Sequence, residues 1–133
     1  MSVQRTRDAM ERYLNSAHSD LTMMAEDVVF TTMATGDEHL GVEGVRRMLD
    51  YVYHQAFDAR AETRNRIYAE DHAVLEGDFV GKHTGTFAGV EATGRQVRVP
   101  LCVVYDVTEG RIVRGRVYLE VPVLMKQLGA VPA

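Results

Sequence analysis

The chain has 133 residues, the usual length of one domain, and 46% of them are hydrophobic, which is enough to bury a core. Its 15 basic and 19 acidic residues give a net charge of −4, which provides no electrostatic basis for binding nucleic acid. Cys102 is the single cysteine, so an intrachain disulfide is excluded, and one thiol is typical of a protein in the reducing cytoplasm. No apolar run approaches the roughly 20 residues that span a bilayer. We therefore expect one cytoplasmic domain over residues 1–133 that binds neither nucleic acid nor a membrane.

The first half of the chain has mainly helical periodicity. Apolar spacing predicts a first helix over residues 3–17, a short second helix around 21–25, and a third helix over 45–57. A β-branched run predicts a strand over residues 28–33. The glycines that follow predict a loop over residues 34–44.

From about residue 61 the period of the pattern changes to two. This predicts strands over residues 62–69 and 72–84 joined by a tight turn, with Gly77 and Gly81 marking a bend or bulge in the second strand. A glycine-rich connection follows over residues 85–94. Helices and one strand followed by a run of antiparallel strands indicate an α+β fold in which helices cover one face of a curved sheet.

The stretch over residues 97–120 alternates strictly and predicts a long antiparallel hairpin with a tight turn at Gly110. The first arm turns one apolar set to a common face: Val99, Leu101, Val103, Tyr105 and Val107. In the second arm, Val113, Val117 and Leu119 are expected on one face, and Ile112, Arg114, Arg116, Tyr118 and Glu120 on the other. Pro122 and Gly129 then frame a short last helix over residues 123–128.

Four short motifs follow one another in the second half of the chain: residues 81–89 (GKHTGTFAG), 92–95 (ATGR), 110–113 (GRIV) and 127–129 (QLG). This series resembles the SnoaL-like polyketide cyclase family, within the cone-shaped fold shared with nuclear transport factor two and ketosteroid isomerase. The resemblance covers nearly the whole chain. It implies a curved mixed or antiparallel sheet wrapped on three N-terminal helices, a short C-terminal helix, and an apolar pocket open at one end. It also implies a homodimer through the sheet, since both faces of the hairpin carry apolar residues.

The same resemblance implies an acid/base residue nine positions before Gly129, which is Glu120 in this chain. The family residue is usually aspartate, so the extra methylene displaces the carboxylate. A carboxylate held in an apolar pocket has its pKa raised toward that of a useful base. The alternative is a solvated carboxylate at the end of a strand.

Tyr13 and His83 complete the expected catalytic set. Tyr13 matches the tyrosine that donates to the oxyanion in ketosteroid isomerase, with core packing as the alternative. His83 belongs to the motif and either shuttles a proton or is a hydrogen-bonded histidine at the rim of the sheet. The isomerase base and second donor would fall near Thr32 and Cys102, which cannot act in the same way, so steroid isomerisation is not favoured.

A further set is expected to contact substrate: Arg116, Tyr118, Arg98, Cys102 and Phe30. Asp37, Glu38, His39 and Glu43 match no standard metal-ligand spacing and are interpreted as a solvated loop. No phosphate-binding loop or dinucleotide motif is present in the sequence. We therefore expect no cofactor and no metal.

Two functions from different classes follow. The first is an enzyme of natural-product biosynthesis, a polyketide cyclase that performs an intramolecular aldol reaction on a small apolar or polyketide-like ligand by acid/base catalysis. The second is a pocket protein of the same fold, either a non-catalytic binder of small molecules or another isomerase or hydrolase. Whether Glu120 lines a closed apolar cavity separates the two.

Overall fold

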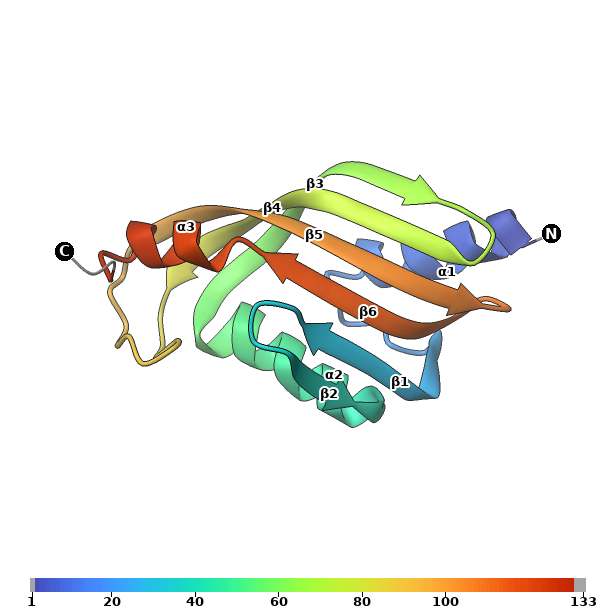
Figure 1. Cartoon of the computed structure of the whole chain (residues 1–133), viewed down its shortest axis with the longest axis horizontal. Helices are drawn as coiled ribbons and strands as arrows, with labels where there is room; N and C mark the ends of the chain where they lie inside the picture. The colour runs from blue at the N-terminus through green and yellow to red at the C-terminus, as the bar shows by residue number, and fades with distance from the viewer. Residues whose placement is uncertain (1, 131–133) are drawn as a thin grey trace.

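A computed structural model describes residues 2–130 as an open, curved sheet with helices packed against its concave side (Figure 1). The helical segments are α1 (Ser2–Asn15), α2 (Gly41–Asp50), the π-helix η1 (Tyr51–Gln55) that continues α2, and α3 (Val121–Gln127). The strands are β1 (Met24–Thr32), β2 (Asp37–Leu40), β3 (Phe57–Tyr68), β4 (His72–His83), β5 (Gln96–Thr108) and β6 (Arg111–Leu119).

The six strands lie in the order β2-β1-β6-β5-β4-β3. All neighbouring pairs are antiparallel except β1 and β6, which run parallel. The long strands β3, β4 and β5 curl over α1, as the upper part of Figure 1 shows. This arrangement confirms the expected α+β fold with a curved mixed sheet.

The bend predicted at the glycines of β4 is present. Thr63 and Asn65 face consecutive positions of β4, so Arg64 is an extra residue in β3 opposite Gly77. A Cβ atom at Gly77 would lie 2.0 Å from the carbonyl oxygen of Glu62, a separation that no side chain tolerates. The missing side chain therefore lets the two backbones approach where the sheet curls.

The long hairpin is also present, with Glu109 and Gly110 at positive φ in its turn. The inward residues of β5 alternate as predicted, and Val99, Tyr105 and Val107 are buried. A register shift beside Val107 changes the alternation in β6. Ile112 consequently turns inward and is fully buried, which corrects its expected place on the outer face.

Two predicted elements of the N-terminal half are wrong. Residues 22 and 23 form a turn rather than part of a second helix, and β1 already begins at Met24. Leu21, Met23 and Met24 are buried, so their apolar spacing reflects core packing rather than a helical face. The predicted loop over residues 34–44 contains β2 and the start of α2. β2 is a polar edge strand that owes its form to pairing with β1, so its sequence has no apolar alternation to reveal it.

The hydrophobic core lies between the concave face of the sheet and the helices α1 and α2. The convex face carries charged and half-buried residues, and the described part of that face is not covered by any helix other than α3 at one end (Figure 1). Among residues 2–130, no helix has both the length and the apolar character needed to cross a membrane.

Candidate functional site

A cavity of about 340 Å³ lies inside the curl of the sheet. Its walls are mainly apolar and come from the concave faces of the strands, from α2 and from the loop after β4; they include Phe30, Leu49, Phe79, Phe87, Val103 and Val117. Phe30 can lie in this wall because Gly115 lies beneath it: a Cβ atom there would approach the phenyl ring to 2.9 Å. A hollow of this kind excludes water from most of what it encloses.

The inner end of the cavity holds a cluster of phenols and one imidazole. Tyr13 comes from the apolar stripe of α1, Tyr105 from the inward face of β5, and Tyr53 from η1. The ring of His18 stacks on Tyr53 at 4.9 Å and meets the edge of Tyr13 at 5.1 Å, measured between ring centroids. Tyr13 and Tyr105 meet edge to face at 6.1 Å. Four groups able to exchange or donate protons thus share one end of an apolar space.

The surroundings of this cluster determine its ionisation. Burial raises the pKa of the Tyr13, Tyr53 and Tyr105 hydroxyls well above that of an exposed phenol. They therefore stay protonated at neutral pH and act as hydrogen-bond donors. Burial, with a smaller contribution from the Arg66 cation, lowers the pKa of His18 to about 4. At neutral pH the imidazole is uncharged and has a free lone pair.

A second polar group lies at the mouth of the cavity. Thr32 at the end of β1, with Asp37 and His39 on β2, lines the opening. The Thr32 hydroxyl and the Nε2 atom of His39 are 3.1 Å apart. Sequence reasoning placed Asp37 and His39 in a solvated loop. Pairing of β2 with β1 turns both toward the opening, and only the two-residue spacing between them hinted at a common strand face.

Glu120 does not lie where we expected. It is exposed and precedes α3, and its neighbours Leu119 and Val121 line the cavity while it does not. Its backbone carbonyl accepts a hydrogen bond from the Leu124 N–H at 3.1 Å, which starts the helix. The expected desolvated carboxylate in an apolar pocket is therefore absent at this position.

His83 is fully buried but is not among the residues that line the cavity. Its Nδ1 atom accepts a hydrogen bond from the Thr93 N–H at 3.1 Å and lies 3.0 Å from the Thr93 hydroxyl. Nδ1 is thus unprotonated, and the proton of the neutral ring sits on Nε2, which has no partner among the described residues. The side chain ties β4 to the end of the glycine-rich loop.

The other motif residues continue this structural clamp. Arg95 donates from Nη1 to the carbonyl of Gln127 at 3.2 Å. The Gln127 amide pairs with the backbone of Arg98 in both directions, at 2.9 and 2.8 Å. These motif residues therefore fasten the loop after β4 to α3 beside the cavity, while Phe87 and Ala88 of the first motif line the cavity itself.

Four of the five expected substrate contacts lie on the convex face of the sheet, away from the cavity. Arg116 forms a bidentate ion pair with Asp106, at 2.9 and 2.7 Å. Arg98 contacts carboxylates of β3 and β4, both at 3.0 Å. Tyr118 is 45% exposed, and Cys102 lies beside it across the ladder. Only Phe30, together with Tyr13 of the catalytic set, lines the cavity.

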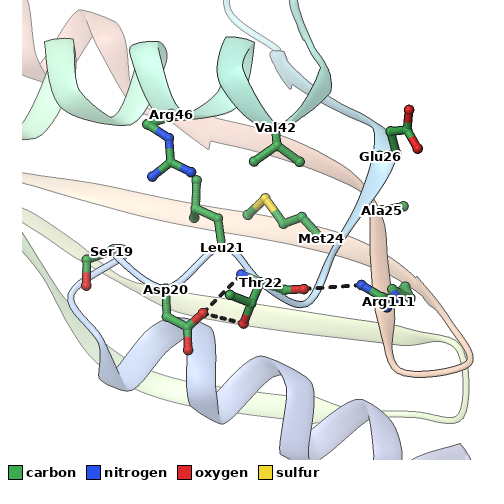
Figure 2. Close-up of a pocket in the computed structure, with 10 residues that line it drawn as sticks. All are labelled: Ser19, Asp20, Leu21, Thr22, Met24, Ala25, Glu26, Val42, Arg46 and Arg111. Carbon is green, nitrogen blue, oxygen red and sulfur yellow. Dashed lines mark hydrogen bonds between the residues drawn. The ribbon is translucent and has the colours of Figure 1, made fainter.

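A wider hollow of about 820 Å³ lies on the surface between residues 19–26, α2 and Arg111 (Figure 2). It is more open than the inner cavity, and polar side chains such as Asp20, Glu26 and Arg46 line much of it. Because this hollow is more open to water than the inner cavity, we place the candidate site in the smaller cavity.

Metal binding has no structural support in residues 2–130, where no group of three or more His, Cys, Asp or Glu side chains could hold an ion. Thr32, Asp37 and His39 line the opening as one hydroxyl, one carboxylate and one imidazole. That is fewer charged or imidazole ligands than a catalytic metal site uses.

Comparison with solved structures shows the same fold at low sequence identity. A proposed SnoaL-like polyketide cyclase from Jannaschia sp. CCS1 superposes with a TM-score of 0.85 at 16% identity, covering 98% of this chain and 96% of that one. A proposed polyketide cyclase from Silicibacter sp. TM1040 gives 0.80 at 20% identity, with 100% and 99% covered. A protein of ketosteroid isomerase-like fold from Catenulispora acidiphila, solved with trimethylamine, gives 0.75 at 15% identity, with 95% of each chain covered.

No protein with a curated function matches the chain in sequence. The family model described as SnoaL-like polyketide cyclase matches residues 4–128, which is nearly the whole chain and includes every element from α1 to α3. The sequence match and the shared architecture agree. The chain belongs to the SnoaL-like polyketide cyclase family.

Proposed function

We propose that the protein is a cofactor-independent cyclase that closes a ring in a small, mostly apolar polyketide-like substrate by an intramolecular aldol reaction. One observation carries this proposal: the apolar cavity has its buried proton donors gathered at its inner end. An enolate needs such donors, and the apolar walls suit the carbon skeleton that must fold around it.

The cavity sets the character of the substrate. Its volume of about 340 Å³ lies at the lower end of the range of small-molecule sites, roughly 300 to 1,000 Å³. Aromatic and aliphatic side chains such as Phe30, Phe79 and Val103 cover its walls. A compact chain with one or two rings fits this space, with its reacting carbonyl directed toward Tyr13.

The phenols supply stabilisation of the transition state. A hydrogen between two carbonyls is already acidic, so the reaction needs a base, a donor to the enolate oxygen and a fixed conformation. Protonated phenols in a water-poor cavity are donors of this type, and loss of one such donor typically costs about 100- to 1,000-fold in rate. Holding the chain folded contributes further, because the two reacting carbons are kept together.

The convex face of the sheet supports pairing of two copies. Ile67 is 57% exposed and Tyr118 is 45% exposed, with half-buried Val74, Cys102 and Val104 on the same face. Arg116 and Arg98 on this face already pair with carboxylates within the chain. A second copy could cover the apolar residues while these ion pairs stay intact, so we extend the proposal to a homodimer that acts in the cytoplasm.

The test uses synthetic aryl poly-β-ketones with three or four carbonyls as substrates. Cyclised products of unchanged mass, or of the mass less one water, are followed by liquid chromatography and mass spectrometry. Val103→Phe fills the cavity and should abolish turnover, while Val3→Phe, at an exposed position of α1, should not. Tight binding of these compounds without any cyclised product would show a binding protein, and equal turnover in both variants would place the reaction elsewhere.

A further inference from the structure

We propose that His18 is the base that removes the proton from the substrate carbon, and that its ring passes this proton to solvent through a separate surface hollow. The inference rests on the proposed cyclase function and adds the proton route to it. It is carried by the position of the ring in the wall between two spaces.

His18 belongs to both spaces. With Tyr53 and Leu49 it lines the inner cavity, and the same three residues line a second hollow of about 170 Å³. The outer hollow opens among polar side chains of α2 and η1, including Asp50 and His54. The imidazole therefore stands between an apolar chamber and a polar opening to water.

Neither nitrogen of the ring is used by the fold. No hydrogen bond joins the imidazole of His18 to another residue within 2–130. Neither of its nitrogens is completely buried, in contrast to Nε2 of His83. Both nitrogens are therefore accessible from the cavity or the hollow. A neutral imidazole has one nitrogen that accepts a proton and one that gives a proton up, so a single ring can serve both spaces.

The backbone holds this ring in place at a cost. Ala17 and His18 are consecutive non-glycine residues with φ of 55° and 62°. This left-handed conformation costs about 1 to 2 kcal/mol per residue. Such strain persists only where the surrounding structure imposes it, and it concentrates at functional sites.

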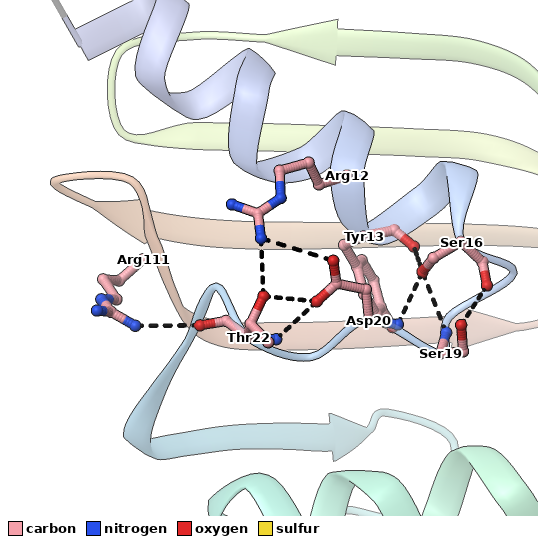
Figure 3. A network of polar contacts seen from close by, with 7 residues as sticks. All are labelled: Arg12, Tyr13, Ser16, Ser19, Asp20, Thr22 and Arg111. Carbon is pink, nitrogen blue, oxygen red and sulfur yellow. Dashed lines mark hydrogen bonds and ion pairs between the residues drawn. The ribbon is translucent and has the colours of Figure 1, made fainter.

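A polar network next to the ring imposes the strain (Figure 3). The Ser16 hydroxyl donates to the carbonyl of Tyr13 at 2.7 Å and accepts the N–H groups of Ser19 and Asp20 at 3.1 and 2.9 Å. Figure 3 shows that this hydrogen-bond network continues through Asp20 to Thr22 and to Arg12 of α1. The network closes the turn on both sides of His18 and directs its ring inward.

The charged and titratable groups around the ring come from four elements. Tyr13 of α1 and Tyr53 of η1 contact it directly, and Arg66 of β3 disfavours its protonation. Arg46 and Asp50 of α2 and His54 of η1 line the hollow outside. The ring is thus neutral at pH 7 and gains a charge only when it takes a proton.

The proposed step balances without a further reactant. One nitrogen of His18 takes the hydrogen from the carbon between two carbonyls, and the C–H electron pair becomes an enolate whose oxygen accepts a hydrogen bond from Tyr13. The enolate carbon attacks a second carbonyl of the same molecule and forms the C–C bond. The imidazolium exchanges the proton that it took for one from water in the outer hollow, and the resulting alkoxide then takes a proton from the imidazolium. One proton leaves to solvent and one enters, so the product has the composition of the substrate.

The base is tested by hydrogen exchange, which does not require cyclisation. The probe is 2-methyl-1-phenyl-1,3-butanedione, which has a single hydrogen between its carbonyls and cannot close a ring. Its exchange in D₂O is followed by proton NMR, with the rate in buffer subtracted. His18→Asn removes the base, and asparagine tolerates the left-handed backbone at this position. We expect the variant to lose at least about 100-fold in exchange, as loss of a positioned base implies, and to keep its affinity for the probe and its melting temperature.

The matched control is His72→Asn, which changes an exposed histidine at the start of β4 that does not line the cavity, and which should keep the exchange rate. Exchange that survives in His18→Asn, or that is lost in His72→Asn, would overturn the assignment. If wild-type protein exchanges the probe but cyclises no poly-β-ketone, His18 remains the base and the proposed cyclase function is wrong. If wild-type protein binds the probe without exchanging it, the assignment of His18 as the base is wrong.

The route is tested with His54→Trp, which covers the outer hollow without touching the inner cavity. With the same diketone probe, a proton that the ring removes returns to the carbon unless it first exchanges with water through the hollow. The covered variant should therefore exchange the probe in D₂O more slowly than wild type does, with unchanged affinity for the probe. Equal exchange in the two proteins would show that the proton does not leave through this hollow.

Discussion

The two faces of the same sheet treat polar groups in opposite ways. On the convex face, polar side chains find partners in the chain: Arg116 with Asp106, and Arg98 with Asp78. On the concave face, Tyr13 and His18 line an apolar cavity, and the His18 ring has no hydrogen-bond partner among residues 2–130. A polar group with partners serves the fold, and a buried one without partners is available to a ligand. This difference, more than residue type, separates the candidate site from the rest of the molecule.

The largest effect should come from adjacent residues of β4 that point to opposite faces. Phe79 is buried in the cavity wall, while Val80 is half-buried on the convex face. Phe79→Ala should lower the free energy of unfolding by about 3 kcal/mol or more through lost packing. Val80→Ala should cost less than about 1 kcal/mol. Urea denaturation measures both, and a larger loss at Val80 that depends on protein concentration would show that the convex face is an interface.

Lowering the pH should change the free energy of unfolding in a different range for each face of the sheet. The pKa of His18 is about 4 in the folded protein and near 6.5 when unfolded. The unfolded chain therefore binds the proton first as the pH falls from 6.5 to 4, and the folded state loses up to about 3 kcal/mol over this interval. Above pH 6.5 the protonation of His18 does not contribute to the pH dependence of the free energy of unfolding.

Comparing His18→Asn with wild type by denaturation at several pH values isolates this contribution. The free energy of unfolding of the variant should depend less on pH between pH 6.5 and 4. The convex carboxylates act in a lower range. Hydrogen bonds from Arg116, Arg64 and Arg98 lower the pKa of Asp106, Asp78 and Glu62 respectively. Their contribution is lost only below about pH 4, as those carboxylates take up protons. Parallel curves for the two proteins would show that His18 is solvated.

The smallest effect is expected when a single phenol hydroxyl is removed from one face or the other and the rates of cyclisation are compared. Tyr13→Phe removes a hydroxyl from the inner end of the cavity and should lower the rate of cyclisation by about 10- to 100-fold with little change in stability, because Tyr53 and Tyr105 remain as donors. Tyr118→Phe on the convex face should change the rate by less than about twofold. Initial rates on the same poly-β-ketone decide the point. Equal rates in the two variants would remove Tyr13 from the reaction.

The features of this fold that depend on periodicity could be predicted from the sequence. The alternation of Val99 to Val107, the glycine bend at Gly77 and the proline in the first turn of α3 each have a local physical cause, and each is present. β2 could not be predicted, because its polar residues form a strand only through pairing with β1. The helix predicted around residues 21–25 is wrong, because the buried residues Leu21 and Met24 follow helical spacing although a turn at residues 22 and 23 lies between them.

The candidate site was less predictable than the fold. Counting along the motif identified Glu120, but the alternation of β6 already placed it with Arg116 and Tyr118, opposite the apolar Val117 and Leu119 that line the cavity. Strand parity was the better guide. His18 gave no signal at all, because a left-handed histidine at the end of a helix cannot be read from residue type. Asp37 and His39 were dismissed with the loop to which they were assigned.

A clamp is formed by His83, Thr93, Arg95 and Gln127. It affects how molecules enter and leave the cavity. It fastens both ends of the segment that carries Phe87, so that side of the opening is held still. The opposite rim, residues 33–36 between β1 and β2, is a short exposed turn anchored mainly by its own backbone. Molecules should enter and leave past this turn. Exchanging its residues is accordingly the way to retune which compounds are admitted while the scaffold stays intact.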